Sequence, residues 1–125
     1  METNMTITLP EDFTTLCSIY QIKPDVFIQS FVNQVSFPHF YSRPHAPDRW
    51  ATFFFLNFID IEDAKCEVND DLEDEYLTKF TDAISQHFYP NHYDEAKAEE
   101  VGRVVMRQWM KAAMADRAKY ITENL

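Results

Sequence analysis

Residues 4–35 read NMTITLPEDFTTLCSIYQIKPDVFIQSFVNQV and contain three structural signals in order. Polar and apolar side chains alternate over 4–9, which is the period of a strand with one buried face. Pro10 ends that pattern, and apolar residues then recur at helical spacing over 11–21 and again from Pro24. Since a single short strand does not stabilise itself, we expect it to pair with another strand, such as that of a second copy of the chain.

Each of these two helices has one apolar side. In the first, Phe13, Leu16, Cys17 and Tyr20 recur at the spacing of a single helical face. In the second, Pro24 suits the first helical position, because its missing N–H would be unpaired there anyway. The apolar residues that follow it are Phe27, Ile28, Phe31, Val32 and Val35.

The next segment contains three prolines and then a strongly aromatic helix. Residues 38–47 are predicted to be an ordered loop, because prolines interrupt regular structure. Residues 48–60 are predicted to be a helix with almost no polar face, so it is either central in the fold or covered by another subunit. Four residues lie where the two segments meet: Arg43, His45, Arg49 and Trp50. We expect them to form either a small anion or partner site, or simply a polar loop around the helix start.

Two further helices are predicted in the second half of the chain. One begins at Asp70, which resembles a capping residue, and ends before Pro90. The other begins after Asn91 and continues towards Thr122, with acidic residues in its first part and basic residues later. That order of charge suits the dipole of one long helix, although a break near Gly102 is an alternative.

Composition favours a mostly α fold. The chain has one glycine and six prolines, and strand-rich folds usually need glycine at tight turns. At 125 residues, 46% of them hydrophobic, it is long enough to bury a core without metals or disulfides. We expect a single helical domain over 1–125, a compact bundle of about five helices with one short N-terminal strand. Residues 4–37 form its strand-helix-helix segment, and 48–123 form an aromatic-rich helical core with a long C-terminal helix.

Net charge is −10, and the acidic residues are concentrated in the middle of the chain. Residues 51–100 carry fourteen acidic and three basic side chains, whereas 101–125 carry two acidic and five basic ones. Residues 1–37 have one base, Lys23, against four acids. Such a surface is repelled by phosphate backbones and anionic lipids, so neither nucleic acid nor a membrane is expected as a partner.

The run 60–75 contains nine acidic residues and one base. It fits a solvated helix start, and it also fits a surface that binds a basic protein. A calcium loop is not expected, because loops starting at Asp60 or Asp70 lack the glycine that such loops need at their sixth position. The candidate partner-binding residues in this run are Asp60, Glu62, Asp63, Asp70 and Asp71.

The sequence contains no catalytic motif. Its serines lack an elbow or Gly-rich context, and phosphate-binding loops require glycines that the chain does not have. The four histidines, His39, His45, His87 and His92, lack the spacing of a helical metal pair. We therefore expect no enzyme activity, no cofactor and no bound metal.

No targeting segment is predicted. The N-terminus lacks a basic region followed by an apolar run, and the longest apolar stretch, 50–59, is too short to cross a bilayer. Cys17 and Cys66 have no metal-ligand spacing to each other, and nothing indicates a disulfide framework. We expect a cytoplasmic protein.

With strand, helix, turn and helix in order, residues 4–35 resemble a ribbon-helix-helix module. The run TITLPE at 6–11 is similar to the strand-to-helix junction of that family. The resemblance implies that the strands of two chains pair as an antiparallel ribbon, whose outward residues read bases in the major groove. In such a module Met5, Ile7 and Leu9 would pack inward.

The resemblance also implies site residues. The outward-facing positions that would meet DNA are Asn4, Thr6 and Thr8. The start of the second helix, near Lys23 and Pro24, would meet a phosphate.

Three functions follow as hypotheses. The first is a non-enzymatic protein-protein interaction module that acts as a homodimer through its N-terminal strand or through the aromatic helix at 48–60, with a further protein partner unidentified. The second is a transcriptional regulator of ribbon-helix-helix type. The third is an acidic inhibitor or immunity-type protein that covers a basic partner with residues 60–75.

Overall fold

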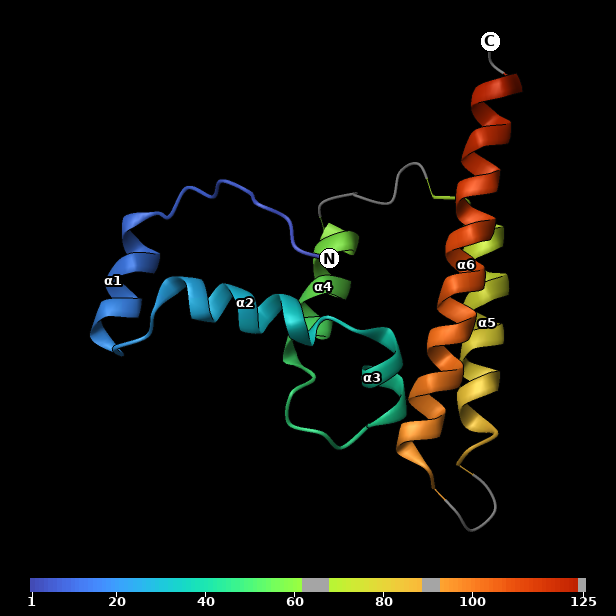
Figure 1. Ribbon diagram of the computed structural model, residues 1–125, viewed down its shortest axis with the longest axis horizontal. Coiled ribbons are helices and arrows are strands. Elements are labelled where there is room, and N and C mark those ends of the chain that lie inside the picture. The colour runs from blue at the N-terminus through green and yellow to red at the C-terminus, as the bar shows by residue number, and fades with distance from the viewer. Residues whose placement is uncertain (62–67, 89–92, 124–125) are drawn as a thin grey trace. The chain divides into compact units, whose positions relative to one another are not determined.

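The computed structural model describes residues 1–61, 68–88 and 93–123, and these are mostly helical, as predicted (Figure 1). Six helices occur in the described residues. They are α1 (Glu11–Ile19), α2 (Pro24–Gln34), α3 (Phe37–Ser42), α4 (Trp50–Ile61), α5 (Asp70–Ser85) and α6 (Glu95–Glu123). None of the helices described is long and apolar enough to cross a membrane.

The predicted strand over 4–9 is wrong for the single chain. No strand occurs in the residues that the structure describes, and 1–9 are exposed and irregular. Within that part of the chain, residues 1–9 make no backbone–backbone hydrogen bond of their own. A strand exists only by pairing with another backbone, so period-two alternation alone does not produce one.

The described residues contain six helices rather than about five, because α3 covers the first part of the predicted loop 38–47 and begins one residue before it. Ser36 caps this helix, its side chain accepting a hydrogen bond from the His39 backbone N–H at 3.2 Å. Pro38 falls in the first turn, where a missing N–H costs nothing. Pro38 therefore marks a helix start, whereas Pro44 and Pro47 lie in the loop between α3 and α4.

Other helix boundaries lie close to the predicted ones. The first helix is two residues shorter than expected, and the second begins at Pro24 as predicted. The cap of α5 is Asn69 rather than Asp70, its side chain accepting from the Leu72 N–H at 3.1 Å. The long helix α6 continues through Gly102 without a break.

The chain divides into two compact units, residues 1–34 and 35–125. This boundary falls close to the end of the predicted segment 4–37, and a single domain over 1–125 stays a prediction. In the first unit, the rings of Phe13 and Phe27 lie 5.7 Å apart and join α1 to α2. Cys17 is the one buried residue of 1–34.

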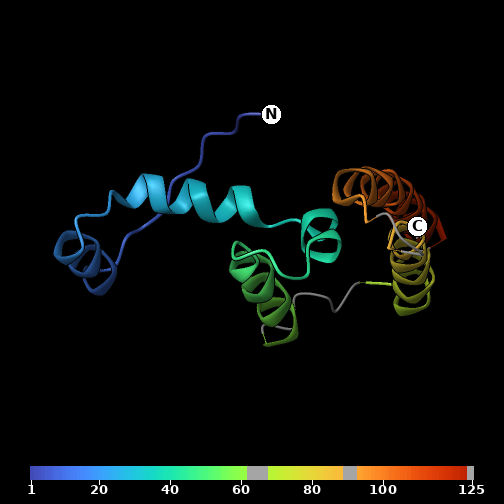
Figure 2. The same cartoon turned by 90° about the horizontal axis from the view of Figure 1, so that it is seen from below.

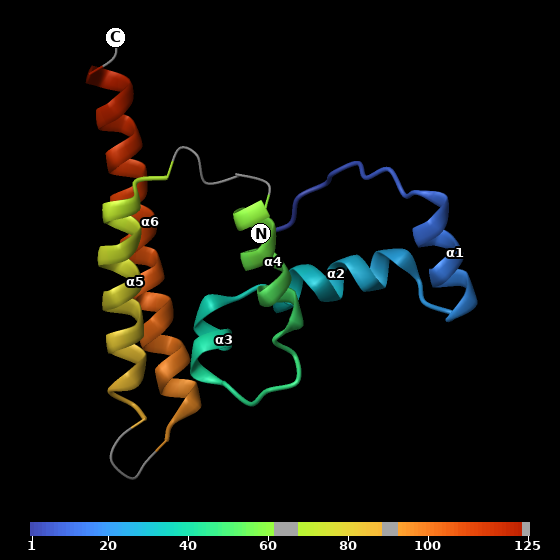
Figure 3. The same cartoon turned by 180° about the vertical axis from the view of Figure 1, so that it is seen from behind.

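The second unit is organised around α5 and α6, which lie side by side and antiparallel (Figures 1 and 3). Their core contains Phe80 and Ile84 from α5 and Ala98 and Val105 from α6. The short helix α3 packs against α6 (Figure 2) and adds Phe37 and Tyr41 to this core.

The aromatic helix α4 is not central. Its buried residues are Ala51 and Thr52, whereas Phe53 and Phe58 are about half exposed, at 55% and 48%. Contacts with α3 hold it in place: the Phe40 and Phe53 rings lie 4.8 Å apart, and the Thr52 hydroxyl accepts from the Ser36 N–H at 3.0 Å. The density of aromatic residues in α4 therefore did not identify the core.

Gly102 sets the distance between α5 and α6. It is buried, and a Cβ at this position would lie 3.0 Å from the side chains of Phe80 and Ile84. Glycine is unfavourable inside a helix by roughly 1 kcal/mol relative to alanine. Here close packing against the two α5 side chains offsets that cost.

We predict that Gly102→Val destabilises the protein by about 1–3 kcal/mol, because the added carbons overpack the contact with α5. Valine has the higher helix propensity, so any loss reports packing alone. The measurement is urea unfolding followed by circular dichroism. Ala115→Val, at an exposed position of the same helix, is the control and should change stability by less than about 1 kcal/mol. Equal effects of both substitutions would contradict this account of Gly102.

Gln21 joins α1 to α2 in a left-handed conformation, with φ of 56°. The turn is closed by the Ile22 N–H, which donates to the Cys17 carbonyl at 2.8 Å. Glycine adopts such a φ without the Cβ clash that costs other residues roughly 1–2 kcal/mol. We predict that Gln21→Gly stabilises the α1–α2 turn by up to about 1 kcal/mol. Slower amide hydrogen exchange in α1 and α2 would show this, while Gln21→Ala, which keeps the Cβ, should give no such slowing.

Candidate functional site

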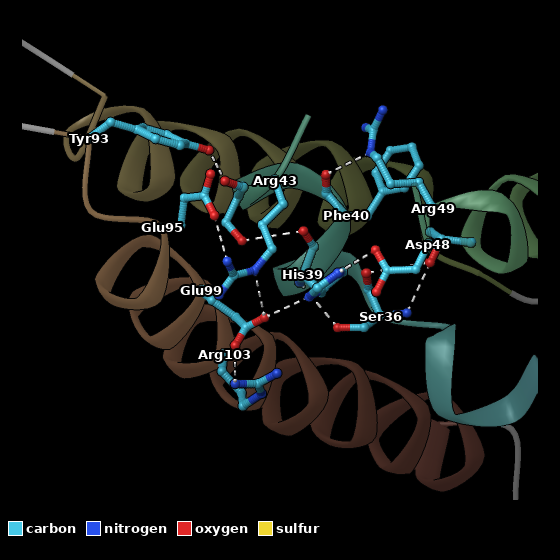
Figure 4. Close-up of polar contacts among 12 residues, drawn as sticks. Ser36, His39, Phe40, Arg43, Asp48, Arg49, Tyr93, Glu95, Glu99 and Arg103 are labelled. Atoms are coloured by element: carbon cyan, nitrogen blue, oxygen red, sulfur yellow. Dashed lines mark hydrogen bonds and ion pairs between the residues drawn. The ribbon is translucent and has the colours of Figure 1, made fainter. Parts of the chain in front are cut away.

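A polar cluster joins α3, the segment before α4, and the first turns of α6 (Figure 4). At its centre is His39. Its Nδ1 lies 3.1 Å from Glu99 Oε1, and its Nε2 lies 3.0 Å from Asp48 Oδ1. Each ring nitrogen thus faces one carboxylate oxygen, so the imidazole ring is held from both sides.

Arg43 extends the cluster along α6. Its guanidinium is hydrogen-bonded to Glu95, and its Nε lies 3.7 Å from Glu99 Oε1. Glu99 is also 3.5 Å from Arg103, one turn further along the helix. The Glu99 carboxylate therefore contacts two guanidinium groups and the His39 ring, and it ties His39 and Arg43 to α6.

These contacts change the acidity of both carboxyl groups. The hydrogen bond from His39 is the main cause that lowers the pKa of Asp48 below its ordinary value of 3.8. Burial raises the pKa of Glu99, but the His39 hydrogen bond and the charges of Arg103 and Arg43 together outweigh it, so the net pKa falls below 4.5. Both carboxyl groups are thus ionised at neutral pH.

Arg49 stabilises the loop between α3 and α4. It donates to the Phe40 carbonyl at 3.2 Å and to the Pro44 carbonyl at 3.0 Å, and its guanidinium lies 3.8 Å from the centre of the Phe40 ring. Arg43 is bound to carboxylates, and His45 is exposed. Arg49 thus has its partners within the α3–α4 region, and Arg43 has its partners on α6, so both arginines are engaged inside the chain, as in a polar loop.

Tyr93 closes the other end of the cluster by donating a hydrogen bond to the Ser42 carbonyl. Burial raises the pKa of this phenol, with a further increase from the nearby charge of Glu95. Tyr93 is therefore a neutral donor, and it fixes the last turn of α3 against the segment that leads into α6.

The chemistry of the cluster is that of an ion-pair and hydrogen-bond network. His39 is held by two carboxylates, and no serine or cysteine side chain bonds to its ring among the residues described. No group of three or more metal-ligating side chains occurs in the described part of the chain. The arrangement positions helices, and it offers neither a nucleophile-base pair nor a ligand set.

The sequence-predicted partner residues lie in different places. Asn4, Thr6 and Thr8 are exposed in the segment before α1. Asp60 is exposed in the last turn of α4, and Asp70 and Asp71 are exposed in the first turn of α5. Glu62, Asp63 and His92 lie outside the described residues, and His87 is half-buried just after α5.

Sequence reasoning missed the contact of His39 with Glu99. The two residues are sixty positions apart, and nothing local to either one indicates the other. The available signals were Ser36 as a helix cap and the order of charges in α6, which places Glu95 and Glu99 in its first two turns. Neither signal specifies a partner.

We predict that the polar cluster makes the free energy of unfolding depend on pH in the acidic range. The pKa values of Asp48 and Glu99 are lowered in the folded state, so their contribution is complete above the unfolded values near 3.8 and 4.5 and is lost as the pH falls through the folded ones. Glu99→Gln should therefore lower the free energy of unfolding by about 1–2 kcal/mol at pH 7 and by much less near pH 3. The control is Glu100→Gln, at an exposed neighbouring position, which should show little change at either pH. A constant Glu99→Gln deficit from pH 7 to pH 3 would contradict the mechanism.

Comparison with known proteins provides no relative from which roles could be transferred. No family model, no curated protein and no solved structure matches the chain. The function must therefore be inferred from the surfaces and contacts of the chain itself.

Proposed function

We propose that this chain is a non-enzymatic protein-interaction module that acts as a homodimer, with residues 1–34 as the dimerisation element. The observation that carries the proposal is the burial of this unit. Its 34 residues contain two helices, and Cys17 is its one buried side chain.

A unit of this size needs additional burial. Segments below about 40 residues rarely fold without a disulfide, a metal or a partner chain. Helices α1 and α2 have nine and eleven residues, and isolated helices shorter than about 12–15 residues are marginal in water. Cys17 is a free thiol, so a partner chain is the stabilising element that we propose.

The apolar surface available for such a partner is large. Large hydrophobic side chains are exposed in the segment before α1, in α1, in the turn and in α2. They include Met5, Ile7, Leu9, Leu16, Ile19, Tyr20, Ile22, Val26 and Val32. Contiguous apolar surface of more than a few hundred Å² usually marks an interface.

A second copy suits this surface better than an unrelated protein, because residues 4–9 combine an exposed, unpaired backbone with polar and apolar side chains in alternation. Two such segments can pair antiparallel about a twofold axis, which turns the alternation of the sequence into one apolar and one polar face. Only Glu2 is charged before Pro10, so two copies would meet with little repulsion. The order of segment, helix, turn and helix is that of the ribbon-helix-helix module that 4–35 resemble.

DNA reading is not included in the proposal. A ribbon dimer of these residues would carry two lysines, both Lys23, against eight acidic residues in its two copies of 1–37. Phosphate contacts supply most non-specific affinity for DNA, so this charge disfavours binding. An electrophoretic mobility shift at low salt is the direct check on that alternative.

We predict that the chain has twice its 14.8 kDa mass in light scattering at tens of micromolar. Ile19→Glu combined with Val26→Glu should give monomers, because four carboxylates would be placed on the apolar faces that we assign to the dimer. The helical circular dichroism of α5 and α6 should remain. The matched control is Ser18→Glu combined with Thr78→Glu, which adds the same charge at exposed polar positions. A wild-type monomer, or equal dissociation of both double variants, would overturn the dimer.

A further inference from the structure

The outer side of α6 combines basic and apolar side chains on one face. Positions separated by three, four, seven or eleven residues share one side of an α-helix. The opposite side carries Ala98, Gly102 and Val105 and packs on α5. The exposed face, which we call the basic face, consists of Arg103, Arg107, Met110, Lys111, Met114 and Arg117.

Three of the four bases of this face have no carboxylate partner within the described chain. The sequence has no acidic residue between Glu100 and Asp116. Arg103 is 3.5 Å from Glu99, but Arg107, Lys111 and Arg117 form no ion pair with any residue that the structure describes. Asp116 accepts a hydrogen bond at 3.2 Å from the side-chain amide of Asn69, the cap residue of α5. The face is therefore a positive strip on a chain of net charge −10.

Apolar side chains lie between the bases. Met110 is 59% exposed and Met114 40%. Exposed methionine is typical of surfaces that adapt to different apolar partners, because its unbranched side chain repacks easily. Charge and apolar contact are thus offered along the same three turns of helix.

We infer that the basic face binds an acidic, amphipathic helical segment of a partner protein. Carboxylates on that segment would pair with Arg107, Lys111 and Arg117, and its apolar residues would contact Met110 and Met114. Helices recognised in this way combine a charged rim with apolar anchors at helical spacing. This assigns the partner surface to a basic part of the chain rather than to the acidic run 60–75.

Two other anionic partners fit the face less well. The phosphates of a nucleic acid would pair with the basic side chains but would be repelled by the remaining negative charge of the chain. A phosphate backbone would also make no apolar contact with the two exposed methionines. Helices that lie on membranes usually insert Trp, Phe or Leu, and none of these is part of the basic face. A protein segment uses both the charges and the methionines.

The inference specifies a partner for the proposed interaction module, but it uses a different surface from the dimer. No residue of 1–34 belongs to the basic face. Light scattering and peptide binding on the same samples therefore separate the two proposals. A monomer that binds peptide through the basic face would overturn only the dimer, and a dimer that does not bind would overturn only the partner surface.

The test is fluorescence anisotropy with the full-length chain and a fluorescein-labelled helical peptide of about 15 residues. The peptide carries leucines along one face and glutamates beside them, and in a second peptide lysines replace the glutamates. Arg107→Glu combined with Lys111→Glu removes the charge of the basic face. Lys79→Glu combined with Lys97→Glu makes the same change of charge at exposed positions outside it.

We expect the acidic peptide to bind, with at least about tenfold weaker affinity for the Arg107→Glu, Lys111→Glu variant and nearly unchanged affinity for the control. Met110→Gln should weaken binding without altering charge, and added salt should weaken binding to the wild-type chain. The inference is overturned if the acidic peptide does not bind, if both double variants bind equally, or if the basic peptide binds as well. It is overturned too if face-dependent binding occurs only with a thymidine oligonucleotide or with phosphatidylserine vesicles.

Discussion

The close approach of α5 and α6 at Gly102 is the constraint on which the second unit depends. With no side chain at this position, Phe80 and Ile84 reach the surface of α6 and become fully buried. In the same unit, Glu95 and Glu99 in the first turns of α6 contact Arg43 and His39. The side of α6 that faces α5 is thereby buried, and the side chains on the opposite side of α6 stay exposed.

The two units differ in how many apolar side chains they bury within themselves. Residues 35–125 have a core of their own, reinforced by an ion-pair network that crosses from α3 to α6. Residues 1–34 have short helices, one buried cysteine and a strained turn at Gln21. Natural proteins are marginally stable, so a unit with so little burial depends on whatever covers it. The basic face of α6 and the apolar surface of 1–34 are consequently suited to separate partners.

The sequence predicts local structure well here and distant contacts poorly. Pro24 correctly marks the start of α2, and the order of charges correctly identifies α6 as one long helix, since both signals act within a few residues. The strand at 4–9 was wrong because pairing is not a local property. The helix α3 was missed because proline interrupts most regular structure but not a first turn. The contact of His39 with Glu99 and the exposure of α4 depend on packing, which no local pattern of residues encodes.

The position of the core along the chain has a consequence for how the protein is made. The α6 residues that pack on α5 lie in the last third of the sequence: Ala98, Gly102 and Val105. The ring of His39 is held on both sides only once Glu99 has been synthesised. During synthesis, residues 1–34 leave the ribosome long before α5 and α6 are complete and can form the core around Phe80. The apolar side chains of 1–34 are then exposed before the second unit has a core, and a homodimer of the proposed kind would start to assemble on neighbouring nascent chains.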